Sequence, residues 1–238
     1  MKNIIEAIKT EKEYWRQRSM YLDTYNLVDK LKEFGFKSFE EYEQQKRLYF
    51  FNNLKFNKVE NITPNAVEEV FKMIDNGKSG VLLIDWDRTA VLSGSGGLKT
   101  MDTTYCEHNN IPVYPINTVG GTIVGTEEDF SLGICCPNKI KVDDEFILNL
   151  IKELIQKYTN DKVTVDGNDI LIANKKVCGS SRYLTDKIYM FVAHFSFSDK
   201  TELIKNICHP DKIGKDVGYI DCMTKEDFKR EVCTWLML

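Results

Sequence analysis

The stretch that decides the fold of this chain is Asn168-Asp169-Ile170-Leu171-Ile172-Ala173-Asn174-Lys175-Lys176-Val177-Cys178-Gly179-Ser180-Ser181. An apolar run typical of a β-strand leads through a short polar turn to Lys176. Gly179 follows at Lys-x-x-Gly spacing and opens a run of small residues, where the backbone can approach a ligand closely. A lysine ammonium beside backbone N–H groups suits a carboxylate or a phosphate. The stretch therefore predicts a strand and turn that bind an anion.

The composition is that of an ordinary soluble protein, with 238 residues, 42% hydrophobic and 29% charged. This length allows one good-sized domain, or one domain with an appendage. The formal charge of −4 argues against a general nucleic-acid binder. The N-terminus does not resemble a signal peptide, and no apolar run approaches the roughly 20 residues of a membrane span. We therefore expect a cytoplasmic protein with no membrane and no nucleic-acid partner.

The cysteines and histidines form no metal-binding or disulfide pattern. Seven cysteines are present at irregular spacing, without any Cys-x-x-Cys, and they indicate neither a zinc ribbon nor a disulfide framework. The three histidines show no metal-ligand spacing with their neighbours. Reduced, mostly buried cysteines are expected.

The chain is predicted to divide near residue 58. Residues 2–33 lack proline and glycine and read as one long helix or two short ones, which Gly35 would end. Ser38 then reads as the N-cap of a second helix that runs to about Asn53, with Glu41 at the capping-box position. Residues 1–58 are therefore expected to form a helical extension, and residues 59–238 a second domain.

Strands outnumber helices in the second part. Thr63 and Pro64 open a helix that Gly77 would close. The clearest later helix spans Asp143–Tyr158, and two more are expected at about 199–207 and 225–236. Strands are predicted at residues 80–84, 89–92, 111–114, 122–124, 130–136, 163–165, 169–173 and 188–197. This order favours an α/β (α+β) fold with a mixed, largely antiparallel sheet and packed helices.

From residue 64 onward, several segments resemble the catalytic domain of lipoate–protein ligases and their biotin-ligase relatives. The resemblance is carried, in order, by Asn65–Glu69, Gly80–Trp86, Thr89–Gly94, Asn110–Val113, Asn168–Ile170, Lys176–Ser181, His194–Ser198 and His209–Lys212. Each motif alone is weak, but their order and spacing match the family. The resemblance implies that fold for residues 59–238, without the small C-terminal accessory domain of many such ligases.

The chain departs from the family at one loop. Where the family has Arg-Arg-x-Ser/Thr-Gly-Gly-Gly, this sequence reads Pro115-Ile116-Asn117-Thr118-Val119-Gly120-Gly121-Thr122. Both arginines and the first glycine are absent, which removes bidentate phosphate contacts and predicts weaker ATP binding. Arg88, Lys99 and Arg182 are candidate substitutes, although none stands at the matching position.

The resemblance assigns to Lys176 the role of holding the acyl carboxylate and the α-phosphate, against the alternative of a solvated turn lysine. It also implies ATP, Mg²⁺ and lipoate or octanoate as ligands, with Asp169 as a candidate Mg²⁺ contact. The acyl- and adenylate-binding residues it implies are Gly94, Asn117, Thr118, Gly120, Gly121, Thr122, Asn168, Asp169, Gly179 and Ser180. Two alternatives stay open from the residues themselves: Gly120 and Gly121 as a hairpin turn, and Asp169 as a strand cap.

Related octanoyltransferases use a cysteine nucleophile and no ATP. Cys178 is the candidate here, with Lys176 and His194 as groups that could lower its pKa. The alternatives are an inert buried Cys178 and a hydrogen-bonded core histidine.

Three functions follow from these observations. The first is a lipoate–protein ligase-like enzyme that attaches a lipoyl or related acyl group to a lysine of a carrier protein through an acyl-adenylate. The second is a catalytically degenerate ligase-fold domain that serves as a binding or assembly module, with residues 1–58 contacting a protein partner. The third is an ATP-independent octanoyl or lipoyl transferase.

Overall fold

A computed structural model of the chain describes residues 3–17, 24–54, 57–58, 63–67, 79–116, 118–140 and 142–236. It divides into two units, Met1–Leu54 and Lys55–Leu238, which are described separately below. None of the helices in these described ranges is long and apolar enough to cross a membrane.

The first unit contains three helices, α1 (Ile4–Gln17), α2 (Thr24–Lys32) and α3 (Phe39–Asn52). The predicted cap of α3 is confirmed, because the Ser38 hydroxyl accepts a hydrogen bond from the Glu41 N–H at 3.1 Å. Gly35 ends the turn after α2 with a φ of 90°, which costs glycine little. The core of this unit is formed by Ala7, Ile8, Tyr14, Leu27, Leu31, Phe36 and Tyr42.

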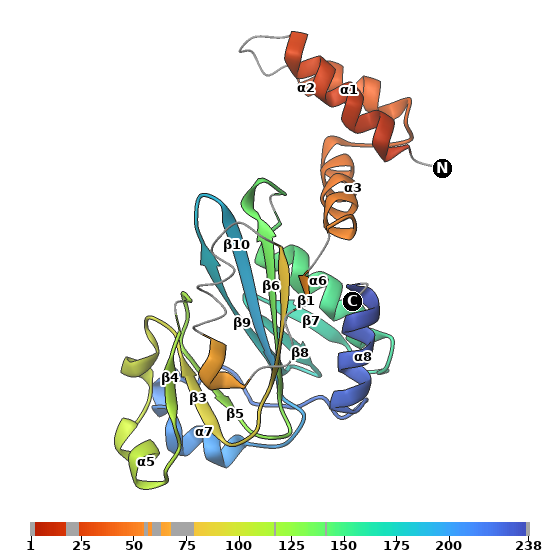
Figure 1. The fold of residues 1–238 in the computed structure, drawn as a ribbon. Coiled ribbons are helices and arrows are strands. Elements are labelled where there is room, and N and C mark those ends of the chain that lie inside the picture. The colour runs from red at the N-terminus through yellow and green to blue at the C-terminus, as the bar shows by residue number, and fades with distance from the viewer. Residues whose placement is uncertain are drawn as a thin grey trace. The chain divides into compact units, whose positions relative to one another are not determined.

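The second unit is built on a seven-stranded sheet with the order β1-β2-β6-β10-β9-β8-β7 (Figure 1). All neighbouring strands are antiparallel except β1 and β2. The predicted fold class, a mixed and largely antiparallel sheet, is confirmed. The strands are β1 (Asn57–Lys58), β2 (Gly80–Asp85), β6 (Phe130–Pro137), β7 (Val163–Asp166), β8 (Asp169–Ile172), β9 (Lys175–Leu184) and β10 (Ile188–Phe195).

A smaller sheet, with the order β4-β3-β5, packs on one face of the large one. Its strands are β3 (Ala90–Ser93), β4 (Val113–Pro115) and β5 (Thr122–Gly125). Leu82, Ile84 and Val192 of the large sheet share a core with Ala90 and Leu92 of β3. The residues of the candidate site described below lie on this face of the large sheet.

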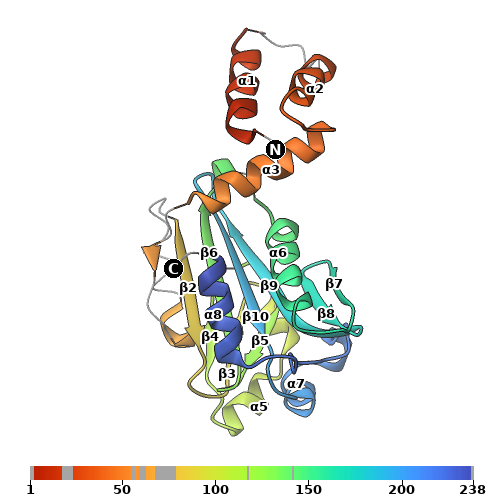
Figure 2. The same ribbon diagram turned by 90° about the vertical axis from the view of Figure 1, so that its right-hand side faces the viewer.

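Helices α6 (Asp144–Gln156) and α8 (Lys225–Trp235) cover the opposite face of the large sheet (Figure 2). Phe228 of α8 packs against Phe130 and Phe195, with ring centroids 6.3 and 4.6 Å away. Both helices begin at the expected kind of N-cap, Asp143 for α6 and Thr224 for α8. Helices α5 (Thr103–His108) and α7 (Thr201–Ile207) pack beside the smaller sheet.

Two expectations need correction or completion. The run after Lys176 belongs to a ten-residue strand, β9, although its glycine and serines have low β-propensity. Pairing with β8 on one side and β10 on the other supplies the hydrogen bonds that hold it extended. The helix expected from Pro64 to Gly77 is described only at its start, as the short helix η1 (Pro64–Ala66), and the rest lies outside the described residues. Helix α5 was not predicted.

Candidate functional site

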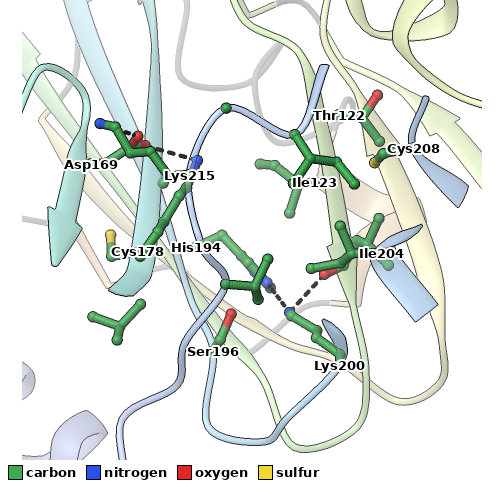
Figure 3. A pocket seen from close by; sticks show the side chains of 17 residues that line it. Thr122, Ile123, Asp169, Cys178, His194, Ser196, Lys200, Ile204, Cys208 and Lys215 are labelled. Carbon is green, nitrogen blue, oxygen red and sulfur yellow. Dashed lines mark hydrogen bonds and ion pairs between the residues drawn. The ribbon is translucent and has the colours of Figure 1, made fainter. Parts of the chain in front are cut away.

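Two adjoining hollows lie over β9 and β10, on the sheet face that carries the smaller sheet. The larger hollow has a volume of about 400 Å³ and the smaller one about 220 Å³. Both are bordered by Thr122, Ile123, Lys176, Gly179 and Cys208. Segment 213–217, which follows α7, closes one side of the larger hollow (Figure 3). Lys176 therefore stands where the two hollows meet.

Lys176 is placed by a tight turn and by strand-like contacts on both sides. Ala173 and Asn174 both have positive φ, 48° and 67°, as in the type I′ turn that suits a two-residue hairpin. The backbone of Lys176 then donates to the Asp216 carbonyl and accepts from the Gly218 N–H, each at 2.8 Å. The backbone of Asp216 and Gly218 is thus hydrogen-bonded to the backbone of Lys176.

A cluster of two lysines and one aspartate lines the mouth of the larger hollow, and we call Asp169, Lys176 and Lys215 the mouth cluster. Lys176 Nζ lies 2.8 Å from Asp169 Oδ1, and Lys215 Nζ lies 2.8 Å from Asp169 Oδ2. Lys215 also pairs with the exposed Asp166 at 3.0 Å. Figure 3 shows the Asp169 carboxylate with a dashed contact to an ammonium on either side. The shared carboxylate fixes both ammonium groups beside the hollow.

Gly179 explains the Lys-x-x-Gly spacing in this chain. A Cβ built at Gly179 would lie 3.0 Å from both Cε and Nζ of Lys176. The glycine therefore leaves room for the lysine to fold back over its own strand. Any larger residue would require the end of the Lys176 side chain to shift by a few tenths of an ångström.

A second cluster, Asp129, His194 and Lys200, is buried in the wall of the larger hollow, and we call it the buried cluster. Lys200 Nζ lies 2.5 Å from Asp129 Oδ2, 2.7 Å from the Val124 carbonyl and 2.8 Å from His194 Nε2. These partners use all three protons of the ammonium. Asp129 also accepts from the backbone N–H groups of Thr126 and Phe197. The cluster ties α7 to β5, β6 and β10.

The buried cluster holds His194 neutral. Burial, together with the nearby Lys200 ammonium, lowers the pKa of His194 to about 4, although Asp129 acts in the opposite direction. Because Nε2 accepts from Lys200, the ring proton belongs on Nδ1, which lies 2.9 Å from the Ser131 hydroxyl. Burial alone would raise the pKa of Asp129, but the Lys200 ammonium holds it below its usual range. His194 is therefore a hydrogen-bonded core histidine in this structure.

The loop at 118–121 packs on the turn that follows β3. Gly94 N, Ser95 N and Gly96 N donate to carbonyls of this loop at 3.0–3.2 Å. A Cβ at Gly94 would lie 2.8 Å from the Gly120 carbonyl, so this turn needs a residue without a side chain. The Val119 N–H donates to the Arg182 carbonyl and is not available to a phosphate. The loop borders the smaller hollow, but it is not a ring of free N–H groups.

Most residues predicted for the site come together. Lys176, Asp169, Gly179, Thr122 and Cys178 border the larger hollow, and Thr118, Gly121 and Ser180 border the smaller one. Three others support it from outside: Gly94, Gly120, which lies over Ser181, and Asn168, whose carbonyl accepts from Ser180. Asn117 lies outside the described residues.

The arginines and the lysine considered as substitutes lie elsewhere. Arg88 pairs with its neighbour Asp87 at 3.0 Å, and Arg182 lies 3.6 Å from Asp144. Neither they nor Lys99 are among the residues that border the two hollows. The second cation is instead Lys215, which the sequence reasoning missed. Nothing in the polar segment around Lys215 marks it, because its place depends on pairing with β9 across 39 residues of chain.

Cys178 has an unsuitable environment for the nucleophile predicted there. Strand pairing sets it opposite Phe195, whose ring packs on Phe228, so its side chain lies on the helix-covered face of the sheet and away from His194. Burial raises the pKa of its thiol, and its exposure is only 1%. Cys208, which the sequence reasoning did not select, is partly exposed and borders both hollows.

The residues present do not fit a metal ion held by the protein. Both oxygens of Asp169 are engaged by ammonium groups. Within the described ranges, there is no group of three or more His, Cys, Asp or Glu side chains that could ligate a metal. The Asp169 carboxylate orients lysines in this arrangement.

Comparison with known proteins identifies the family to which this chain is similar. A model of the lipoyl protein ligase A/B catalytic domain matches residues 65–228. No match was found among curated proteins.

Several solved structures share the fold at low identity. A bipartite lipoate protein ligase from Thermoplasma acidophilum, described with its E2 lipoyl domain, aligns with a TM-score of 0.58 at 12% identity, over 78% of this chain and 84% of that one. LipL1 of P. falciparum in complex with lipoate aligns with a TM-score of 0.58 at 11% identity, over 82% of this chain and 56% of that one. A lipoate-protein ligase A bound with ATP aligns with a TM-score of 0.56 at 14% identity, over 77% of this chain and 84% of that one. At these identities the likeness establishes the fold.

Proposed function

The chain belongs to the lipoyl protein ligase A/B catalytic-domain family, and on that basis we propose that it attaches a lipoyl or related medium-chain acyl group to a lysine of a carrier protein through an acyl-adenylate. The observation that carries the proposal is the position of Lys176, which borders both hollows and is held by Asp169 at 2.8 Å. An acyl-adenylate has two parts joined at a carboxylate and a phosphate. A fixed cation between two hollows suits that junction.

The charges around the hollows favour one orientation of this ligand. The larger hollow is bordered by two ammonium groups at its mouth, those of Lys176 and Lys215. Lys176 is the one charged side chain among the residues that border the smaller hollow. We therefore assign the nucleotide part to the larger hollow and the acyl chain to the smaller one, because a phosphate needs cations and an acyl chain does not.

The residues of the chain then act by holding and stabilising. ATP, when bound, supplies the adenylyl group: a carboxylate oxygen bonds to the α-phosphorus, the bond to the β-phosphate breaks, and pyrophosphate leaves. Lys176 neutralises charge on the carboxylate and phosphate oxygens, and Asp169 keeps its ammonium in place. The amine of the carrier lysine attacks the acyl carbon, an amide forms, and AMP leaves with the bonding electrons.

The affinity for ATP is expected to be modest. The family arginines have no counterpart, and Lys215 contributes a point charge in place of a bidentate guanidinium. Loss of two charge-assisted contacts of about 1.5–3 kcal/mol each lowers affinity by orders of magnitude unless other groups compensate. Lys215 compensates for part of this loss in our proposal.

A second candidate is an ATP-independent acyl transfer, which the position of Cys208 favours over Cys178. Its thiolate would attack an acyl thioester and release the donor thiol, leaving the acyl group on Cys208. A carrier lysine amine would then take the acyl group as an amide and restore the thiol. Burial and the nearby Cys106 raise the pKa of Cys208 overall, and the charge of Lys176 partly opposes this rise.

The partner in either reaction is proposed to be a lipoyl-carrier domain, as in the T. acidophilum system. A cytoplasmic setting and a role of residues 1–58 in partner binding stay predictions from the sequence. A catalytically degenerate binding module is the remaining alternative.

The decisive experiment combines calorimetry with a transfer assay. Lipoate and octanoate are titrated with and without ATP and Mg²⁺ into wild type, Lys176→Ala and Cys208→Ser, and mass spectrometry follows acylation of a lipoyl domain. The ligase proposal expects ATP-dependent acylation that is lost in Lys176→Ala and kept in Cys208→Ser. Acylation from an acyl thioester that is lost in Cys208→Ser supports the transferase. No binding and no acylation under any condition leaves the degenerate module.

A further inference from the structure

Two aspartates stand opposite each other at the end of the hairpin that β7 and β8 form. Asp166 pairs with Asp169 across the two-residue turn Gly167-Asn168. Gly167 has a φ of 62° and occupies the first central position, where a type II′ turn favours glycine. Like charges directly opposite on paired strands destabilise a hairpin. The arrangement therefore calls for a cation that contacts both carboxylates.

Lys215 supplies that cation and has three close oxygen partners. Its Nζ lies 2.8 Å from the Asp166 carbonyl, 2.8 Å from Asp169 Oδ2 (Figure 3) and 3.0 Å from Asp166 Oδ2. A lysine ammonium has three donors, so an incoming anion must replace one of these partners. The ammonium groups of Lys176 and Lys215 face two carboxylates. Asp166 and the mouth cluster together therefore carry no net charge before a ligand arrives.

The exposure of the two carboxylates decides which of them gives way. The Asp166 side chain is 66% exposed, whereas that of Asp169 is 16% exposed. Asp169 also holds Lys176, and a carboxylate this buried is costly to leave without its partners. An exposed ion pair contributes little, and water hydrates the Asp166 carboxylate once the pair opens. Asp166 is therefore the partner that an anion displaces most easily.

We propose that Asp166 is the exchangeable partner of Lys215, and that a phosphate oxygen of the bound nucleotide takes the place of its carboxylate. The Asp166 carbonyl and the Asp169 carboxylate keep the ammonium at the mouth of the larger hollow during this exchange. The inference rests on the proposed function, which puts the nucleotide in that hollow. A triphosphate carries several charges against one on Asp166, so Coulomb attraction favours the exchange. Asp166 thus competes with the nucleotide and lowers its affinity.

The test is a double-mutant cycle between Asp166 and Lys215. Calorimetry measures the binding of ATP with Mg²⁺ to the full chain as wild type, Asp166→Asn, Lys215→Ala and the double variant. Asp166→Asn is expected to bind ATP roughly 2- to 5-fold more tightly, the range of one exposed ion pair. This gain should shrink as salt is added. Lys215→Ala should weaken binding, and in that background Asp166→Asn should lose most of its effect, because the competition needs the ammonium.

The matched control is Asp216→Asn. Asp216 is the exposed neighbour of Lys215 in segment 213–217. This variant removes the same charge from the same region but leaves the three partners of Lys215 in place. It should change the affinity for ATP less than Asp166→Asn does. An equal gain in the two variants would reveal a general effect of charge and overturn the exchange.

The remaining outcomes separate this inference from the function it rests on. ATP binding that is unchanged or weaker in Asp166→Asn, or that Lys215→Ala does not weaken, overturns the inference, while acyl transfer that depends on Lys176 upholds the function. Failure of ATP to bind wild type and every variant overturns the inference and the ATP-dependent function together. The calorimetric stoichiometry reports the folded fraction of each variant, so a loss of affinity is distinguished from a loss of folded protein.

Discussion

The mouth cluster and the buried cluster each pair lysine with aspartate beside one hollow, yet they differ in burial and in the number of hydrogen-bond partners. In the mouth cluster the side chains of Lys176, Lys215 and Asp169 are 40%, 27% and 16% exposed. In the buried cluster those of Lys200 and Asp129 are 3% and 0% exposed. All three protons of Lys200 have partners, whereas Asp169 is the one ion-pair partner of Lys176 within the described ranges.

This difference separates a structural lysine from one that can bind a ligand. A saturated, buried lysine has no donor left for a ligand, and removing it would leave a charge stranded in the core. A partly exposed lysine fixed by one shared carboxylate keeps donors for an incoming anion. Burial and partner count, which the identity of the residue does not reveal, therefore assign the two roles.

The largest expected effect comes from breaking the buried cluster. Lys200→Ala should lower the free energy of unfolding by about 3–5 kcal/mol, because Asp129 is left charged and unpaired in the interior. Urea denaturation measures this directly. The double variant Asp129→Asn with Lys200→Met should recover much of the loss, since it removes both charges. A loss below about 1 kcal/mol in Lys200→Ala would show that water reaches Asp129.

A substitution in the mouth cluster should leave the free energy of unfolding nearly unchanged and lower the rate of acyl transfer. Lys176→Ala is expected to change the free energy of unfolding by less than about 1 kcal/mol, as for other partly exposed ion pairs. The rate of acyl transfer should fall about 10²- to 10³-fold, the usual effect of losing one electrostatic contact to the reacting group. Single-turnover kinetics on a lipoyl domain measure it.

The matched control for this variant is the neighbouring exposed lysine. Lys175→Ala should change neither quantity appreciably. Equal rate losses in the two variants would contradict the role given to Lys176.

Acid should destabilise the chain through the buried cluster. His194 has a folded pKa of about 4 and an ordinary unfolded value near 6.5, so the unfolded chain binds more protons between these pH values. Its contribution is complete above about pH 6.5 and is lost as pH falls toward 4, by up to about 3 kcal/mol. The lowered pKa of Asp129 adds a further loss in the same direction at lower pH.

Urea denaturation at pH 7, 5.5 and 4 tests this dependence. In His194→Gln the slope of stability against pH should become shallower between pH 6.5 and 4. An unchanged slope in that variant would assign the acid sensitivity to other groups.

The smallest expected effect concerns the turn that carries the mouth cluster. Ala173 has a φ of 48°, a region that costs a residue with a Cβ about 1–2 kcal/mol. Ala173→Gly should therefore stabilise the chain, by about 1 kcal/mol after the extra flexibility of glycine is counted. Asn174→Gly should stabilise the chain less, because asparagine tolerates a positive φ better than alanine does. Thermal unfolding distinguishes them, and a lower melting temperature in Ala173→Gly would argue against this turn geometry.

Much of the fold was predictable because its signals are local. Ser38, Asp143 and Thr224 each begin a helix, and the buried Ile147, Ile151, Leu154 and Ile155 of α6 follow the predicted apolar stripe. Strand β9 and helix α5 were not defined, since their residues lack strong propensity and depend on neighbours for hydrogen bonds and packing.

The site was predictable only where it lies within one motif. Lys176, Gly179 and Asp169 stand within a single hairpin, so their spacing showed that they belong together. Lys215, Lys200 and Cys208 reach the hollows from segments after β10, and no local pattern marks them. Strand alternation turns the Cys178 side chain to the helix-covered face, which its position in the lysine motif did not indicate.

The sequence by itself determined the order of strands and helices, the caps that begin the helices and the lysine motif with its glycine, because each depends on residues a few positions apart. The tertiary structure alone decided which lysine is buried and saturated, and which second lysine joins Lys176. Those outcomes depend on burial and hydrogen-bond partners supplied by distant segments, and only the packing of the two sheets with α7 brings these segments together.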